Sequence, residues 1–171
     1  MKKNHIRGIG LILSGLVSLN SYAVEVKIKG NLIKNPPCHI TGPDGPDQPI
    51  KIQFGEMGIT KINGENYQQN FTLKVNCEDG LGEGVLLYLE YRGIKSPFDN
   101  NAIQAYPAGL GIRLYHGGVV IPPNTGTKII MSNNDTAELP LTAIPVKDNR
   151  PSVVLREGDF TASATIEILY P

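Results

Sequence analysis

The sequence predicts an all-β chain folded as an antiparallel sandwich. No apolar pattern with a helical period persists for three turns, which disfavours long helices. Short runs of β-branched and aromatic residues recur instead, and glycine, proline, asparagine and aspartate separate them. The chain has 171 residues and no linker, repeat or low-complexity segment, so we expect a single domain.

Seven or eight short strands account for most of this pattern. We expect them at residues 24–33, 50–54, 71–76, 85–91, 111–115, 128–131, 138–146 and 159–170. Turn-forming pairs such as Asn63-Gly64 and Gly117-Gly118 lie between them. Strands and turns at this spacing are typical of an Ig-like sandwich.

The first 23 residues have the three parts of a secretory signal peptide. A basic start with Lys2, Lys3 and Arg7 precedes an apolar run at 9–19, and Ser21-Tyr22-Ala23 provides small residues for cleavage. A membrane anchor would need about 20 apolar residues, and this run is shorter. We therefore expect residues 24–171 to be exported without being inserted in a membrane.

Export places the two cysteines in an oxidising compartment, where pairing is the default. Cys38 and Cys77 are the only two cysteines, so they are expected to form a structural disulfide. A reactive thiol or a metal ligand is the less favoured alternative.

Composition argues against several other functions. The chain has 16 basic and 16 acidic residues, so it lacks the positive potential of a nucleic-acid binder. Neither His39 nor His116 lies at metal-ligand spacing from another histidine or cysteine. No nucleophile motif is present, so we expect no catalytic residue, metal or cofactor.

Both ends of the exported chain alternate between apolar and polar residues, with Leu169 the one apolar exception at the second end, which indicates strands with one face buried. At the start, one face carries Val24, Val26, Ile28, Gly30 and Leu32. At the end, one face carries Phe160, Ala162, Ala164, Ile166, Ile168 and Tyr170. Chain ends fray unless something pairs with them. Pairing within a closed sandwich and pairing with another chain both remain open.

These features together resemble the pilins of the bacterial chaperone–usher pathway, particularly the minor subunits of P-type pili. In that family a tyrosine stands next to last and a glycine fourteenth from the end, as Tyr170 and Gly158 do here. Three further segments resemble tip-fibrillum subunits: Gly30-Asn31-Leu32-Ile33, Pro37-Cys38-His39-Ile40 and Gly111-Ile112-Arg113-Leu114-Tyr115.

The resemblance implies a domain at residues 34–171 that lacks the last strand of its sandwich. A donor strand then completes the fold, first from a periplasmic chaperone and later from the neighbouring subunit. The outer-membrane usher and other pilins would be the remaining partners, in a fimbrium on the bacterial surface.

The resemblance also assigns roles to residues at the two ends. Residues 24–33, hereafter the arm, would be the donor strand that enters the neighbour, with Val24, Val26, Ile28 and Leu32 as apolar pegs and Gly30 where the groove narrows. The receiving edge would be the strand of Phe160 to Tyr170, which Gly158 leads into.

Two other functions remain open at this point. A carbohydrate-binding fimbrial adhesin is one, although such proteins usually carry a receptor domain ahead of the pilin domain. A self-contained secreted sandwich, with both end strands paired inside the chain, is the other.

Overall fold

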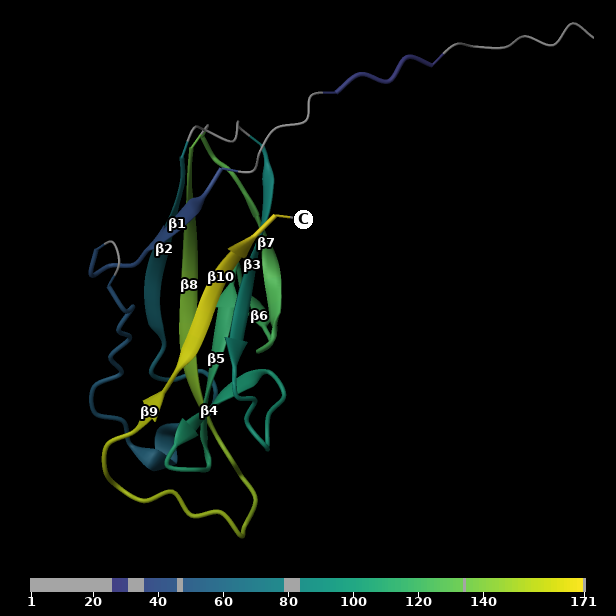
Figure 1. Cartoon of the computed structure of the whole chain (residues 1–171). Coiled ribbons are helices and arrows are strands. Elements are labelled where there is room, and N and C mark those ends of the chain that lie inside the picture. Colours follow the sequence, from purple (N-terminus) through teal and green to yellow (C-terminus); the bar gives the residue numbers. More distant parts are fainter. Residues whose placement is uncertain (1–25, 31–35, 46–47, 79–83, 134, 171) are drawn as a thin grey trace, which may run out of the picture. The chain divides into compact units, whose positions relative to one another are not determined.

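The structure is a computed structural model, and it describes residues 26–30, 36–45, 48–78, 84–133 and 135–170. The chain divides into two units, Met1–Ile33 and Lys34–Pro171. In the first unit the described residues 26–30 have no regular secondary structure. All the strands belong to the second unit, in which Figure 1 labels the elements.

The larger sheet, sheet 1, is antiparallel and holds seven strands. In spatial order they are β1 (Cys38–Thr41), β2 (Gln69–Cys77), β8 (Thr136–Lys147), β5 (Leu110–His116), β4 (Ala102–Tyr106) and β9 (Thr161–Ala162), with β6 (Val119–Ile121) also paired to β5. The long central strand β8 pairs with β2 on one side and β5 on the other. Strands β5 and β6 join through Gly117 and Gly118, whose φ values of 55° and 79° suit a tight hairpin turn.

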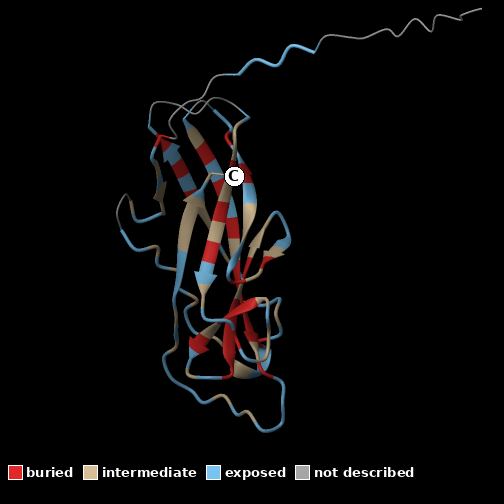
Figure 2. Cartoon of the chain, turned by 45° about the vertical axis from the view of Figure 1, so that its right-hand side comes forward, coloured by how far each residue is buried: buried red, intermediate tan, exposed pale blue. Residues whose placement is uncertain are grey.

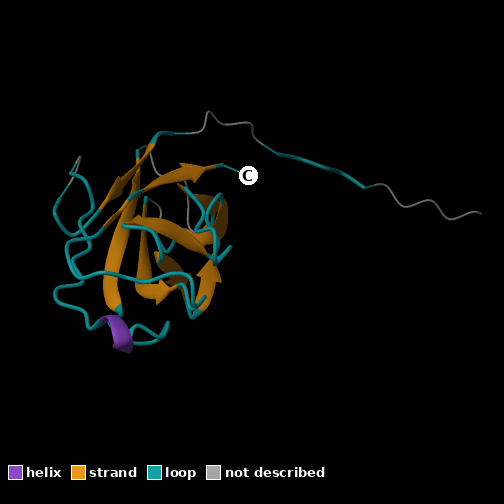
Figure 3. Ribbon diagram, turned by 90° about the horizontal axis from the view of Figure 1, so that it is seen from below, coloured by secondary structure: helices purple, strands orange, loops and turns teal. Residues whose placement is uncertain are grey.

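The smaller sheet, sheet 2, has three antiparallel strands in the order β10 (Ala164–Leu169), β3 (Leu86–Gly93) and β7 (Thr125–Ile130). Strands β7 and β3 approach closely at Gly126, where an added Cβ would lie 2.1 Å from the backbone oxygen of Leu89. The one helix of the described part is a single 3-10 turn, η1 (Ile59–Lys61), visible among the strands in Figure 3.

The core lies between the two sheets. Buried side chains alternate with exposed ones along the strands, as the red and pale blue bands of Figure 2 show. Leu73 and Val75 of β2, Leu87 and Leu89 of β3, and Leu139 of β8 are each at most 1 % exposed. In these strands the alternate apolar side chains therefore form the buried face that the sequence predicts.

Most predicted strands are confirmed, with shifted ends. Residues 71–76, 85–91, 111–115, 128–131 and 138–146 fall in β2, β3, β5, β7 and β8. The prediction at 50–54 is wrong, because this segment alternates in burial but pairs with no strand. Strands β1, β4 and β6 were not predicted. They are short, and each is stabilised by a longer neighbour.

The predicted strand at 159–170 is interrupted. Its first part, β9, pairs with β4 in sheet 1, and its second part, β10, pairs with β3 in sheet 2. The chain crosses from one sheet to the other at Ser163, which belongs to neither strand. The final segment thus borders both layers of the sandwich, as its course in Figure 1 shows.

Candidate functional site

The final strand leaves one edge of sheet 2 open. Strand β10 pairs with β3 on one side, and its other side has no strand partner among the described residues. Strand β1 likewise ends sheet 1, and within the described ranges it pairs with β2 alone. An unpaired sheet edge presents free backbone N–H and C=O groups that can hydrogen-bond to an added strand.

A double row of incompletely buried apolar side chains accompanies these two edges, and we call it the apolar strip. All its members pack on the core and remain partly exposed to solvent. They are Cys38, Ile40, Ile50, Ile52 and Phe54 on the β1 side, and Phe160, Ala162, Ile166, Ile168 and Tyr170 on the β10 side.

The strip contrasts with the strand beside it. Leu87 and Leu89 of β3 are fully buried, whereas Ile166 and Ile168 of the neighbouring β10 are only half-buried. Both strands carry apolar residues at alternate positions, so the difference does not come from composition. It arises because β3 has a strand on each side and β10 has only one.

Contacts at two places join the two sides of the strip. The Phe54 and Phe160 rings pack with their centroids 5.9 Å apart at a tilt of 48°. At the other end of the final strand, the Tyr170 hydroxyl donates to the Pro36 carbonyl and lies 3.1 Å from Cys38 Sγ. Partial burial raises the pKa of Tyr170 above its ordinary value of 10.0.

The predicted disulfide is confirmed. Cys38 and Cys77 are bonded and face each other in the register of β1 and β2. Strand β1 has only four residues, so this bond anchors one side of the strip to the core strand β2. In the chain-entropy account, a bridge across this sequence separation of 39 contributes roughly 4 kcal/mol.

The outer face of β10 carries Thr165, Glu167 and the exposed Leu169. Glu167 lies 3.7 Å from Arg92 of β3, and the same guanidinium is 2.7 Å from Glu90. The hydrogen bond from Arg92 holds the pKa of Glu90 below its ordinary value. The ion pairs keep this part of the outer face charged, whereas the inner face of β10 carries the apolar side chains that pack on the core.

The predicted receiving residues lie mostly where expected. Ile166, Ile168 and Tyr170 line the strip, as do Phe160 and Ala162. Ala164 has the same parity as Ile166 and Ile168 in β10, but its side chain is exposed and does not belong to the strip. Gly158 and Phe160 precede β9 rather than forming part of a strand, and Gly158 has a φ of +137°, which favours glycine.

The predicted donor residues belong to the first unit. Val26 and Ile28 are exposed, at 77 % and 91 %, and Gly30 is exposed as well. Val24 and Leu32 lie outside the described residues.

Sequence reasoning missed the β1 side of the strip. The alternation of Ile50, Ile52 and Phe54 was visible, but it predicted an ordinary strand rather than one wall of a half-open surface. Ile40 was overlooked because β1 is short and proline-flanked.

Comparison with known proteins agrees with this architecture. The family model described as "Fimbrial protein" matches residues 26–171. The chain belongs to the fimbrial protein family. It is a structural pilus subunit of the chaperone–usher type, exported through the periplasm to the bacterial surface.

Two curated relatives from Escherichia coli cover nearly the whole chain. The uncharacterized fimbrial-like protein YfcR of strain K12 is 26 % identical over 179 residues, covering 99 % of this chain and 96 % of YfcR. The fimbrial adapter PapF is 25 % identical over 174 residues, covering 95 % of each chain. This fimbrial subunit is thus similar in length to both.

The fold is shared with a solved pilin. The crystal structure of the P pilus rod subunit PapA aligns with a TM-score of 0.60 and 18 % identity, covering 79 % of this chain and 99 % of PapA. The fold of this fimbrial subunit is therefore an incomplete Ig-like antiparallel sandwich.

Proposed function

We propose that this chain is an adaptor-type minor subunit of a pilus, which accepts a strand along the apolar strip and donates its own arm to a neighbour. The observation that carries the proposal is the strip itself. It is a double row of apolar side chains, each still partly exposed, between two sheet edges with open hydrogen-bonding groups.

An added strand would both pair with the open hydrogen-bonding groups and cover the partly exposed apolar side chains. Its backbone would pair with the open edge of β10, and its alternate side chains would cover residues such as Ile166 and Ile168. Before assembly the donor would be a periplasmic chaperone, and in the fibre it would be the arm of another subunit, exchanged at the outer-membrane usher.

The arm has the composition of such a donor. Four of its residues, Val24, Val26, Ile28 and Leu32, are aliphatic and share a face. Burying four aliphatic side chains contributes on the order of 6–12 kcal/mol before ordering costs, enough for a long-lived joint. Removal of residues 1–23 as a signal peptide would place Val24 at the start of the processed chain.

The adaptor role rests on similarity. PapF, named a fimbrial adapter, matches this chain over 95 % of both sequences. The second unit, Lys34–Pro171, holds all the strands of the described residues in one sandwich.

Strand acceptance can be tested with three forms of residues 24–171. The first is the chain alone, the second carries a copy of the arm fused after Pro171 through a flexible linker, and the third is fused to an arm with Val26→Asp and Ile28→Asp. We expect only the second form to be a stable monomer. Its free energy of unfolding should exceed that of the third form by at least about 4 kcal/mol. Urea denaturation and gel filtration provide the measurement.

Equal stability of the three forms would show that the strip needs no added strand. That outcome would favour a self-contained secreted sandwich.

Adaptor behaviour is tested separately, by measuring binding of a synthetic 24–33 peptide to each of the other pilins of the same organism. An adaptor's arm should bind to some of these pilins and not to others.

A further inference from the structure

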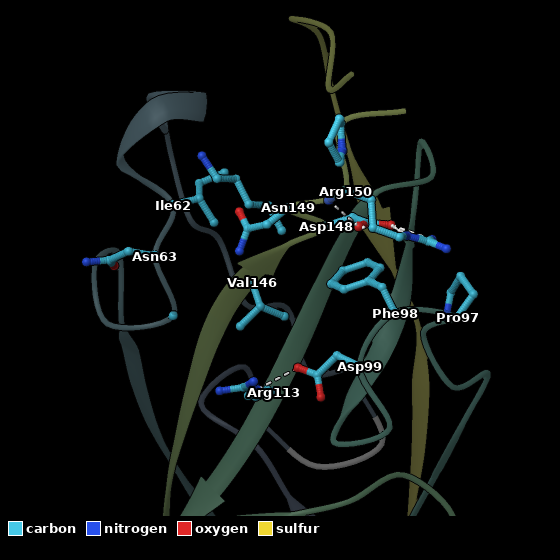
Figure 4. A pocket seen from close by; sticks show the side chains of 13 residues that line it. Ile62, Asn63, Pro97, Phe98, Asp99, Arg113, Val146, Asp148, Asn149 and Arg150 are labelled. Atoms are coloured by element: carbon cyan, nitrogen blue, oxygen red, sulfur yellow. Dashed lines mark hydrogen bonds and ion pairs between the residues drawn. The ribbon is translucent and has the colours of Figure 1, made fainter. Parts of the chain in front are cut away.

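A surface hollow of about 790 Å³ lies away from the apolar strip (Figure 4). Its lining comes from the loops after η1 and β3, from β5, and from the end of β8 with the turn that follows. No residue of β1, β9 or β10 takes part. In β5, Ile112 and Leu114 point into the core, so Arg113 between them faces outward into the hollow.

Two ion pairs hold the walls in place. Arg113 Nε donates to Asp99 Oδ2 at 2.7 Å, and Arg150 Nε donates to both oxygens of Asp148 at 2.9 and 3.0 Å. The Asp148 side chain is 3 % exposed, so this pair is built into the fold. Figure 4 shows the two pairs at opposite ends of the hollow.

Other residues of the lining have unused hydrogen-bonding groups. Lys147 Nζ donates one bond to the Ile59 carbonyl at 3.0 Å, which leaves two further N–H groups. Asn149 is exposed, and its side chain makes no hydrogen bond within the described part of the chain. Both carboxylates of the lining are already ion-paired, so Lys147 leaves the hollow with an excess of positive charge.

The hollow also has an apolar side. The half-buried Phe98 ring and the Val146 side chain lie between the two ion pairs in Figure 4. A volume of about 790 Å³ is within the range of small-ligand sites. An aromatic face with amide, ammonium and guanidinium donors around it suits a ligand that has an apolar ring face, hydroxyl groups and an anionic group.

We propose that this hollow binds a saccharide unit carrying a carboxylate, such as a uronic acid. The C–H face of the sugar ring packs on Phe98 and Val146, the Asn149 amide bonds to hydroxyl groups, and Lys147 binds the carboxylate. Because the hollow shares no residue with the apolar strip, a pilus subunit can fill the strip and keep this site open.

The test measures binding of glucuronate and of glucose by saturation-transfer NMR and calorimetry, using residues 24–171 in whichever form, alone or arm-fused, is the stable monomer. We expect glucuronate to bind at least about fivefold more tightly than glucose. Lys147→Gln should weaken glucuronate binding about tenfold and remove the preference, and Asn149→Ala should weaken both sugars about fivefold.

Matched controls are Lys128→Gln on β7 and Asn76→Ala on β2, both exposed and outside the lining, which should change nothing. Circular dichroism confirms folding of each variant. Equal affinity for the two sugars, binding untouched by the Lys147 and Asn149 variants, or displacement by sulfate at the same concentration as glucuronate would overturn the proposal. The last result would mean that the hollow binds charge without recognising a sugar.

Discussion

Asp148 is one of two buried polar residues in the described part of the chain, and its charge is compensated locally. Three nitrogens of Arg150 surround its carboxylate, one from the backbone and two from the guanidinium. The side-chain hydrogen bonds from Arg150 hold the pKa of Asp148 below its ordinary value of 3.8. A buried acid with this pairing stabilises the fold only while it is ionised.

This pairing predicts a pH-dependent effect of Asp148→Asn. Since the folded pKa is depressed, the stability that ionised Asp148 contributes is present above 3.8 and is lost as pH falls through the lower folded value. The variant should be less stable than the parent at neutral pH, and the gap should narrow as the pH falls below 3.8. Urea denaturation across this range measures it.

Glu138→Gln is the matched control, because Glu138 is exposed and lies 3.7 Å from Lys74 in a surface pair. Its free energy of unfolding should follow the parent throughout. A gap for Asp148→Asn that does not narrow at all as the pH falls below 3.8 would contradict the assignment.

At the scale of elements, the same apolar alternation has two outcomes. In β3 it produces fully buried leucines, and in β10 it produces half-buried isoleucines, because only β3 lies between two strands. The position of a strand in its sheet, rather than the residue type, decides how far a side chain of the strip is buried.

We therefore expect Ile168→Ala to cost little or nothing when the strip is uncovered and to behave as a core truncation when it is covered. In the arm-fused chain the loss should be about 2–4 kcal/mol in free energy of unfolding. Val154→Ala, at a side chain that is 77 % exposed, should cost less than about 0.5 kcal/mol in the same form. Matching small losses for both variants would show that the added arm does not cover β10.

At the scale of the whole molecule, our proposal gives the two units separate roles. Residues 34–171 contain all ten strands of the described part, and the arm belongs to the other unit. An added Cβ at Gly30 would meet nothing within 4 Å. A change at Gly30 should leave the folding of the chain's own domain unaffected, while altering how the arm fits elsewhere.

Gly30→Leu is predicted to separate these roles. The stability of the sandwich completed by an unaltered fused arm should not change. By contrast, a 24–33 peptide with this substitution should bind partner pilins at least about tenfold more weakly, because a side chain would enter where the groove narrows. Peptide-binding assays test this, with Lys29→Leu on the opposite face as the control. Equal binding by the Gly30 and Lys29 variants would refute a close-packed role for Gly30.

Much of this architecture could be predicted from local pattern. Period-two alternation located β2, β3, β5, β7 and β8, and the spacing of Tyr170 and Gly158 indicated the family. The pairing of Cys38 with Cys77 followed because no other cysteine exists. Each of these depends on neighbouring residues or on simple counting, so no knowledge of distant contacts was required.

The sequence by itself determined the strand-rich class, the disulfide and the alternating faces of the two chain ends. Only the tertiary structure decided that Ile40, Ile50, Ile52 and Phe54 pack on the core yet remain partly exposed, that the final strand changes sheet at Ser163, and that Lys147, Asn149 and Phe98 border one hollow. The physical reason is that alternation is encoded within a few residues, whereas burial and pairing depend on which strands, distant in sequence, lie on either side.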